Sequence, residues 1–260
     1  MALTTSAAAV FCRAALCYNR ATLFWRMRVT WQAILFDLDG TLLDLRMADF
    51  LPRYFQALTR WAVAHGVPAE EFTARLHAAT EAMLRNQGPE TNAQVFARHF
   101  YPLAGRGEEH WRPVFDAFYR EVFPQLRGQA GPRPQARRVV EAALARGYPV
   151  VLATNPAFPE AAVRQRMAWA GVDDLPFVLV TTYENCRATK PNPRYYRGIC
   201  DALRVDPARC LMVGDEPMDM AAAQVGLATY WVDEGDNPLP ADLPWAPTWH
   251  GPLEGVRAVL

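Results

Sequence analysis

Two aspartates separated by one residue, Asp37 and Asp39, follow directly on an apolar run over Ala33–Phe36. The run has the length and apolarity of a buried parallel strand, and such strands end at the crevice where open α/β sheets bind ligands. Gly40 then lets the chain turn away from the strand. Because two carboxylates held this close repel each other, the pair predicts a cation beside it. The pattern indicates carboxylate catalysis next to a positive charge.

An EF-hand calcium loop also begins with Asp-x-Asp, but it needs glycine at its sixth position and glutamate at its twelfth. Counted from Asp37, those positions hold Leu42 and Ala48, and the preceding segment is typical of a strand and not of a helix. The calcium loop is therefore disfavoured. An ordinary turn that carries aspartates stays open on this motif alone, because Asp and Gly are common turn residues.

Further polar side chains stand where other predicted strands open onto the same crevice. Thr154 and Asn155 follow a second apolar run. Asp215 follows a third, and Asp219 comes one helical turn later on the same side. Each has an ordinary explanation when taken singly, as a helix cap or an acidic turn. Their order after the Asp-x-Asp pair is what favours a common site.

Lys190 is the single lysine among the 27 lysines and arginines of the chain. Two prolines, Pro191 and Pro193, stiffen the loop around it and could aim the ammonium group inward. A position that keeps lysine in an arginine-rich chain suggests a need for a compact ammonium group, which the planar guanidinium of arginine does not replace. We expect Lys190 to offset the repulsion between the carboxylates.

The segments that must position these residues alternate between strand and helix patterns. This alternation predicts a Rossmann-like α/β core, a three-layer parallel sheet with crossover helices. The predicted strands are Ala33–Phe36, Pro149–Ala153, Phe177–Val180, Cys210–Val213 and, as the last, Ala228–Val232. The predicted helices of this core are Ala136–Arg146, Glu160–Ala170 and Pro193–Leu203.

A helical segment separates the first strand from the rest of the sheet. Four amphipathic stripes lie between Leu45 and Leu126, and Thr91 is the expected N-cap of the third helix. We interpret the aromatic stripes as hydrophobic core and not as a cofactor box. The predicted domains are therefore an α/β core over 31–44 and 128–250 and an all-helical cap over 45–127. Residues 1–30 are interpreted as an N-terminal extension, disordered or preceding a true start at Met27.

The composition excludes several partners. The 260 residues carry no formal net charge, which gives no footprint for nucleic acid and no field for a membrane surface. The five cysteines are odd in number and form no Cys-x-x-Cys pair, which suggests a reducing, cytoplasmic setting without a zinc site. We expect a monomer or a homodimer.

With these residues in view, the sequence resembles the haloacid dehalogenase superfamily of phosphohydrolases, in its phosphoglycolate phosphatase-like form with a helical cap after the first motif. The resemblance covers Ala33 to Val232. Glu216 and Pro217 depart from it, because many relatives have small or polar residues there. The four family motifs are matched in order by Asp37-Leu38-Asp39-Gly40-Thr41, Thr154-Asn155, Lys190-Pro191, and Gly214-Asp215 with Asp219.

The resemblance implies a role for each matched residue, and the chemistry of phosphoryl transfer agrees with it. Asp37 would attack phosphorus, and Asp39 would protonate the leaving oxygen and then activate water. Thr154, Asn155 and Lys190 would hold the substrate and its phosphoryl oxygens. The implied cofactor is Mg²⁺, bound by Asp37, the backbone carbonyl of Asp39 and Asp215, with Asp219 as a ligand or a support of that shell.

The function implied is hydrolysis of a small phosphorylated metabolite by a Mg²⁺-dependent phosphatase. Asp39 and Asp215 argue against a dehalogenase, which needs neither a second acid nor a metal. A phosphomutase of the same superfamily and a non-catalytic binding or regulatory protein on the same fold stay open. The candidates to reach the leaving group are four cap residues, although residues of this kind usually lie on solvated helix faces. They are Arg46, Arg53, Arg98 and His99.

Overall fold

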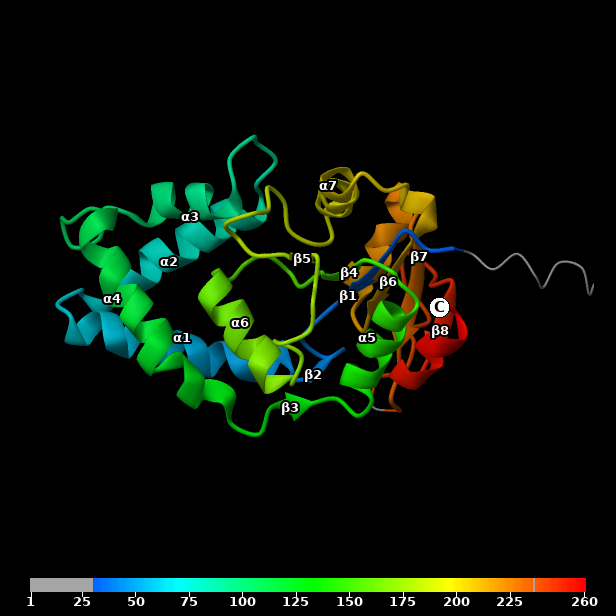
Figure 1. Cartoon of the computed structure of the whole chain (residues 1–260). Helices are drawn as coiled ribbons and strands as arrows, with labels where there is room; N and C mark the ends of the chain where they lie inside the picture. The colour runs from blue at the N-terminus through cyan, green and yellow to red at the C-terminus, as the bar shows by residue number, and fades with distance from the viewer. Residues whose placement is uncertain (1–29, 236) are drawn as a thin grey trace, which may run out of the picture. The chain divides into compact units, whose positions relative to one another are not determined.

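The core of the chain is a six-stranded parallel sheet (Figure 1). The computed structural model describes residues 30–235 and 237–260, and Trp31–Leu260 form one compact unit. The predictions for the N-terminal extension, including Cys12 and Cys17, lie outside the described residues. The strand order is β5-β4-β1-β6-β7-β8. These strands are β1 (Ala33–Phe36), β4 (Val150–Leu152), β5 (Leu179–Val180), β6 (Cys210–Gly214), β7 (Ala228–Val232) and β8 (Trp249–Gly251).

The central strand β1 is buried on both faces, as its continuous apolar sequence requires. Successive side chains of a strand point to opposite faces, and here Ile34 and Phe36 pack in one hydrophobic cluster while Ala33 and Leu35 pack in another. Helix α5 (Ala136–Ala145) belongs to the first cluster, and helix α7 (Pro193–Leu203) belongs to the second. The sheet is therefore the middle of three layers, which confirms the predicted α/β fold class.

Four helices follow β1 and lie beside the sheet, away from β7 and β8 (Figure 1). The predicted N-cap of the third is confirmed, because Thr91 and Gln94 form a reciprocal capping box. The four helices are α1 (Met47–Ala64), α2 (Ala69–Leu84), α3 (Asn92–Phe100) and α4 (Glu108–Glu121). The remaining helices are α6 (Glu160–Trp169), α8 (Pro217–Met220) and the 3-10 turns η1 (Phe123–Arg127), η2 (Pro207–Arg209), η3 (Ala221–Val225) and η4 (Leu253–Ala258).

The two segments that connect the core to the four helices lie side by side. Strand β2 (Leu43–Asp44) pairs antiparallel with β3 (Gly131–Pro132), so the two connections of the helical segment are hydrogen-bonded to each other. Each strand has two residues, too short for a sequence pattern. The division into core and cap domains stays a prediction.

One prediction about the sheet is wrong: Ala228–Val232 is not its last strand. β8 pairs with β7 in parallel, and η4 then packs against α5. Leu253 and Val256 of η4 are fully buried in the main hydrophobic cluster. β8 is only half-buried and carries Trp249 and His250 where an apolar run would be expected, which explains why its sequence gives no strand signal. Among the described residues, no helix is long and apolar enough to cross a membrane.

Candidate active site

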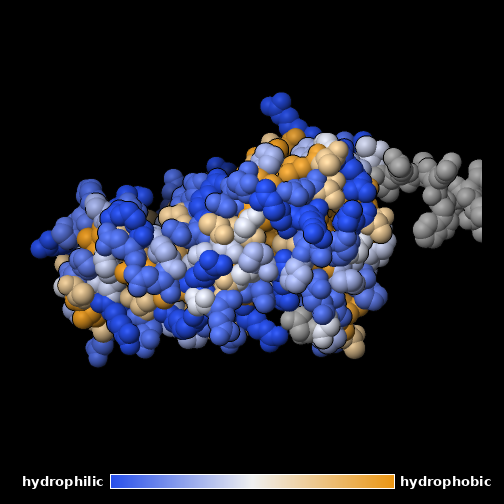
Figure 2. Space-filling view, turned by 60° about the horizontal axis from the view of Figure 1, so that its bottom comes forward, coloured by the Kyte–Doolittle hydropathy of each residue, from blue (hydrophilic) through white to orange (hydrophobic). Residues whose placement is uncertain are grey.

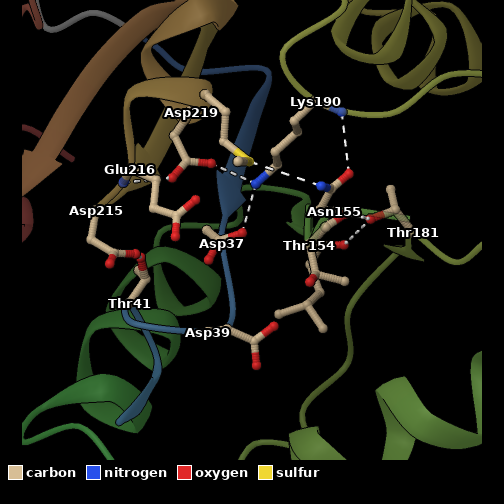
Figure 3. Close-up of polar contacts among 12 residues, drawn as sticks. Asp37, Asp39, Thr41, Thr154, Asn155, Thr181, Lys190, Asp215, Glu216 and Asp219 are labelled. Atoms are coloured by element: carbon tan, nitrogen blue, oxygen red, sulfur yellow. Dashed lines mark hydrogen bonds and ion pairs between the residues drawn. The ribbon is translucent and has the colours of Figure 1, made fainter. Parts of the chain in front are cut away.

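Three neighbouring strands deliver polar residues to one edge of the sheet. β1 lies between β4 and β6, and the three strands end just before Asp37, Thr154 and Asp215, respectively. Because parallel strands present their carboxyl ends at the same edge, residues far apart in sequence meet there. Figure 3 shows the resulting cluster, with Asp37 at its centre. The structure thus brings together the residues of all four predicted motifs.

Lys190 is the buried cation at the centre of this cluster. Its Nζ donates to Oδ1 of Asp37 at 2.6 Å and to Oδ1 of Asp219 at 2.5 Å (Figure 3). The side chain is 1% exposed, so solvent does little to weaken these ion pairs. The expectation that the single lysine offsets repulsion between carboxylates agrees with this placement.

Asp215 is held at the tip of β6 by the first motif. The hydroxyl of Thr41 donates to its Oδ1 at 2.8 Å. The neighbouring Gly40 has a φ of +90°, and a Cβ built there would lie 2.1 Å from Oδ2 of Asp215. Glycine at position 40 therefore permits both the turn and the close approach of the carboxylate.

Gly214 makes a comparable close approach possible for Asp219. A Cβ at position 214 would lie 2.2 Å from Cγ of Asp219. The second carboxylate oxygen of Asp219 accepts from the backbone N–H of Glu216 at 3.1 Å. With one oxygen bound to Lys190 and the other to this amide, Asp219 has a fixed orientation and supports the lysine.

Three carboxylates at this edge are close enough to hold one metal ion. Asp37, Asp215 and Asp219 each offer an oxygen, and these oxygens lie within 4.8 Å of one another. Burial raises the pKa of Asp37 well above its ordinary value despite the opposing charge of Lys190. Burial, followed by repulsion from Asp219, raises the pKa of Asp215 to about 7. Three carboxylates thus share one ammonium group, so their ionised forms need further positive charge, and their oxygen donors suit a hard divalent cation.

Asp39 has a different partner and lies outside that carboxylate cluster. Its Oδ2 forms an ion pair with Nη1 of Arg166 on α6, and the Arg166 side chain is fully buried. The guanidinium also lies 4.5 Å from the ring centre of Phe158. Burial raises the pKa of Asp39, and Arg166 opposes this shift. In Figure 3 the Asp39 carboxylate points away from Lys190. Its backbone carbonyl stays the predicted metal ligand.

Thr154 and Asn155 lie beside the aspartates on the loop after β4. The backbone carbonyl of Thr154 accepts from the hydroxyls of Thr181 at 2.7 Å and Tyr195 at 2.9 Å, which fixes the loop. Oδ1 of Asn155 accepts from the backbone N–H of Lys190 at 3.3 Å and so ties this loop to the lysine loop. Both residues line the same pocket as Asp37. Their predicted contacts with substrate stay predictions.

A pocket of about 410 Å³ opens above Asp37 and Asp39. Its floor consists of the strand-tip residues, and its walls come from α1 to α4 and from the loops after β4 and β5. Part of each aromatic stripe is core, as predicted: Phe50 and Phe72 are fully buried. Other members of the same stripes, including Tyr54 and Phe96, line the pocket. The helices therefore supply both a core and a substrate-sized wall.

The four cap residues proposed to reach the leaving group do not line this pocket. All four are exposed. Arg98 pairs with Glu90, and Nε of Arg53 donates to the backbone carbonyl of Asp49 at 3.3 Å. Helix-face positions explain this outcome, because long charged side chains remain in water unless they find a buried partner.

Arg166 is the site residue that the sequence analysis missed. It lies one helical turn from Ala162 and next to Met167, and both of these residues are fully buried. An arginine on the buried face of an amphipathic helix was the available signal, because a buried charge requires a partner. Glu216, noted only as a departure from the family pattern, lines the pocket beside Asp219.

Comparison with known proteins identifies the class of protein that this fold and site define. The family model for haloacid dehalogenase-like hydrolases matches residues 31–226. The chain belongs to this family.

The particular relatives are phosphatases, and the prediction of a phosphatase enzyme is confirmed. The chain is 31% identical to phosphoglycolate phosphatase of Rhodospirillum rubrum, over 74% of this chain and 75% of that one. It is 33% identical to phosphoserine phosphatase of Thermus thermophilus, over 68% and 69% of the two chains.

Solved structures confirm the fold. A crystal structure of a predicted phosphoglycolate phosphatase from Haemophilus somnus matches with a TM-score of 0.53 at 20% identity, covering 88% of this chain and 98% of that one. A putative β-phosphoglucomutase from Thermotoga maritima matches with a TM-score of 0.52 at 22% identity, covering 88% and 97%. At these identities the likeness is one of fold.

Proposed function

We propose that this chain is a Mg²⁺-dependent phosphatase that hydrolyses a small phosphomonoester through an aspartyl-phosphate intermediate. The observation that carries the proposal is the placement of Asp37 at the floor of the pocket. Its carboxylate lies 2.6 Å from the buried Lys190 and is one of three carboxylates within 4.8 Å. A nucleophilic carboxylate, a fixed cation and a set of oxygen ligands are what phosphoryl transfer through an aspartyl-phosphate needs.

The residues present fit a magnesium ion. Asp37 and Asp215 would hold it with the backbone carbonyl of Asp39, and the raised pKa values of the two carboxylates agree with a place where positive charge is needed. Asp219 already accepts from Lys190 and from the Glu216 amide, which favours a supporting position for it. Bound there, Mg²⁺ would neutralise charge on the phosphoryl oxygens.

The chain's own residues supply the covalent and proton-transfer steps. A carboxylate oxygen of Asp37 attacks phosphorus as the bond to the leaving oxygen breaks, and Asp39 gives that oxygen its proton. Asp39 then takes a proton from water, which attacks the aspartyl-phosphate and releases inorganic phosphate. The raised pKa of Asp39 makes its acid form available for the first step.

Lys190 and Thr154 would stabilise the charge that develops on the phosphoryl group. The ammonium group of Lys190 is held in place before substrate arrives, so little reorganisation accompanies the reaction. Thr154 lines the pocket beside Asp37 and presents a hydroxyl donor. We further propose that 45–127 act as a cap, joined to the core through the paired strands β2 and β3, that excludes water during transfer.

The test is phosphate release from a panel of phosphomonoesters, with Mg²⁺ and with a chelator, by the unmodified chain and by Asp37→Asn. We expect release only from the unmodified chain with Mg²⁺. Asp201→Asn is the matched control, because it removes an exposed carboxylate that does not line the pocket. Full activity of Asp37→Asn, or phosphate release that a chelator does not reduce, would contradict the mechanism.

The same assay separates the other functions that the motifs allow. Transfer of phosphoryl groups from a sugar bisphosphate without phosphate release would identify a phosphomutase. Tight binding of an ester without turnover would identify a binding protein.

A further inference from the structure

The walls of the pocket carry no charge. The side chains that α1 to α4 contribute to it are apolar, apart from tyrosine hydroxyls and Thr80. Within residues 30–235 and 237–260, no Lys, Arg or His side chain lines this pocket. The charged side chains that do line it are four carboxylates at its floor, Asp37, Asp39, Glu216 and Asp219.

The two buried cations of the site are paired with floor carboxylates, and Nη2 of Arg166, which has no hydrogen-bond partner among the described residues, is buried and does not line the pocket. Lys190 bonds to Asp37 and Asp219 beneath the pocket, and Arg166 bonds to Asp39. A second negative charge on the substrate, such as a carboxylate, would therefore lose its water without gaining a cationic partner on the walls. It would also be repelled by the floor. A positively charged leaving group would meet aromatic rings, which attract cations only weakly at exposed sites, and no carboxylate on the walls.

The polar groups that the walls offer are neutral, and two of them bond to each other. The hydroxyls of Tyr54 and Tyr119 lie 2.8 Å apart and hydrogen-bond to each other. Burial raises the pKa of Tyr54 to about 12 and that of Tyr119 well above its ordinary value, so both remain uncharged. The wall is suited to an apolar group that needs little from it except contact.

We propose that the substrate of this site is the phosphate monoester of an uncharged, hydrophobic alcohol or phenol. The phosphoryl group lies on the charged floor, and the leaving group fills the aromatic pocket of about 410 Å³. This inference rests on the proposed phosphatase function and names the substrate class for it. It separates this chain from relatives named for phosphoglycolate and phosphoserine, whose esters carry a carboxylate.

The test compares two esters that differ by one charge. The ratio of kcat/KM for phosphate release is measured with phenyl phosphate and 4-carboxyphenyl phosphate, beside phosphoglycolate, phosphoserine and phosphocholine. We expect phenyl phosphate to exceed its carboxylated analogue by about tenfold or more, because the added charge is desolvated without a partner. Preference for a carboxylated ester or for phosphocholine would overturn the inference and leave the phosphatase proposal standing. No release from any ester would contradict both.

Two arginine variants, at positions that are equally exposed to solvent, test whether the wall sets the preference between the two esters. Leu84 of α2 lines the pocket and is 48% exposed, while Val63 of α1 is 47% exposed and does not line it. We expect both positions to accept a long side chain, because each reaches solvent. Leu84→Arg should move the ratio about tenfold toward the carboxylated ester, since it adds the missing cation. Val63→Arg should leave the ratio unchanged.

The ratio of the two esters does not depend on how much enzyme is folded, so a loss of stability cannot imitate the result. An unchanged ratio in Leu84→Arg would show that the leaving group does not contact this wall. That result would overturn the proposal.

Discussion

The floor and the walls of the pocket differ in the side chains that line them: charged on the floor and uncharged on the walls. On the floor, charged groups stand at strand ends and on the adjoining loops, and ion pairs such as that between Lys190 and Asp37 hold them. On the walls, uncharged side chains from helices pack by shape. The floor therefore determines which reaction takes place, while the walls determine which molecule undergoes it. Relatives can share the first and differ in the second.

The two regions also differ in how firmly they are held. The residues of β1 that carry the floor are fully buried in the centre of the sheet. The walls include Phe55 and Leu84, which are partly exposed to solvent. Changes to the walls should accordingly cost little stability, and changes to the floor should cost much activity. Variants of the two regions test this contrast.

The largest effect is expected from the nucleophile. Asp37→Asn should lower kcat by at least about a thousandfold, because an amide cannot form the aspartyl-phosphate. Leu84→Ala, a wall change, should lower kcat/KM for an apolar ester through KM and leave kcat within a few-fold. Steady-state kinetics on both variants measure the contrast. Comparable losses of kcat in the two would show that floor and wall are not functionally distinct.

The second effect concerns the ion pair that lies just beneath the floor. Arg166→Met should lower the free energy of unfolding by about 3–5 kcal/mol, because Asp39 would stay buried without its cation. Equilibrium unfolding in urea measures the change. The double variant Arg166→Met with Asp39→Asn should regain much of that loss, since it removes the unpaired charge.

An exposed ion pair on the same helix is the control for Arg166. Arg164 pairs with Glu160 at 3.1 Å, and both side chains are about half exposed. Arg164→Met should change the free energy of unfolding by less than about 1 kcal/mol. If Arg166→Met were equally mild, the buried pair would not hold Asp39 in place.

The third effect is the pH dependence of magnesium binding. Burial raises the pKa of Asp215 from 3.8 to about 7 in the metal-free protein. A ligand must lose its proton before it binds metal, and burial also raises the pKa of Asp37, the other carboxylate ligand. Affinity should therefore fall by about tenfold or more per pH unit below pH 7. Calorimetric titration with Mg²⁺ between pH 5.5 and 8.5 measures this.

A change at Thr41 tests whether protonation of Asp215 causes this pH dependence. The hydrogen bond that Thr41 donates lowers the pKa of Asp215, so Thr41→Val should move the fall in affinity to higher pH. Thr73→Val, which removes an exposed hydroxyl bonded to the Ala69 carbonyl on α2, should leave it unchanged. An affinity that does not vary with pH would contradict the expected proton competition at the floor.

The contrast also explains how much the sequence could predict. The floor was predictable because three of the residues that build it, Asp37, Thr154 and Asp215, follow short apolar runs. Apolar runs ending at Phe36 and near Val213 indicate buried strands, and parallel strands bring Asp37 and Asp215 to one edge. Local patterns were sufficient there, because the sheet converts position in a strand into position in space.

The walls and the Arg166 contact could not be predicted in the same way. An amphipathic stripe reports that a helix buries one face, but it does not say whether that face meets other helices or borders a cavity. Phe50 and Tyr54 come from the same stripe of α1 and both pack in the core, but only Tyr54 also lines the pocket. Arg166 meets Asp39 across 127 residues, and that contact depends on how α6 is oriented against the core.

The smallest expected effect lies in the wall itself. Tyr54→Phe removes one hydroxyl of the Tyr54–Tyr119 pair, whose oxygens lie 2.8 Å apart, and leaves the ring in place. The free energy of unfolding should fall by only about 0.5–1.5 kcal/mol, as for one hydrogen bond between neutral groups. The kcat/KM for phenyl phosphate should stay within about threefold, a change in barrier below 1 kcal/mol, because an apolar leaving group does not use the hydroxyl. A much larger kinetic loss at unchanged stability would mean that this hydroxyl bonds to the substrate. The wall would then select by polarity as the floor does, and the contrast between the two regions would fail.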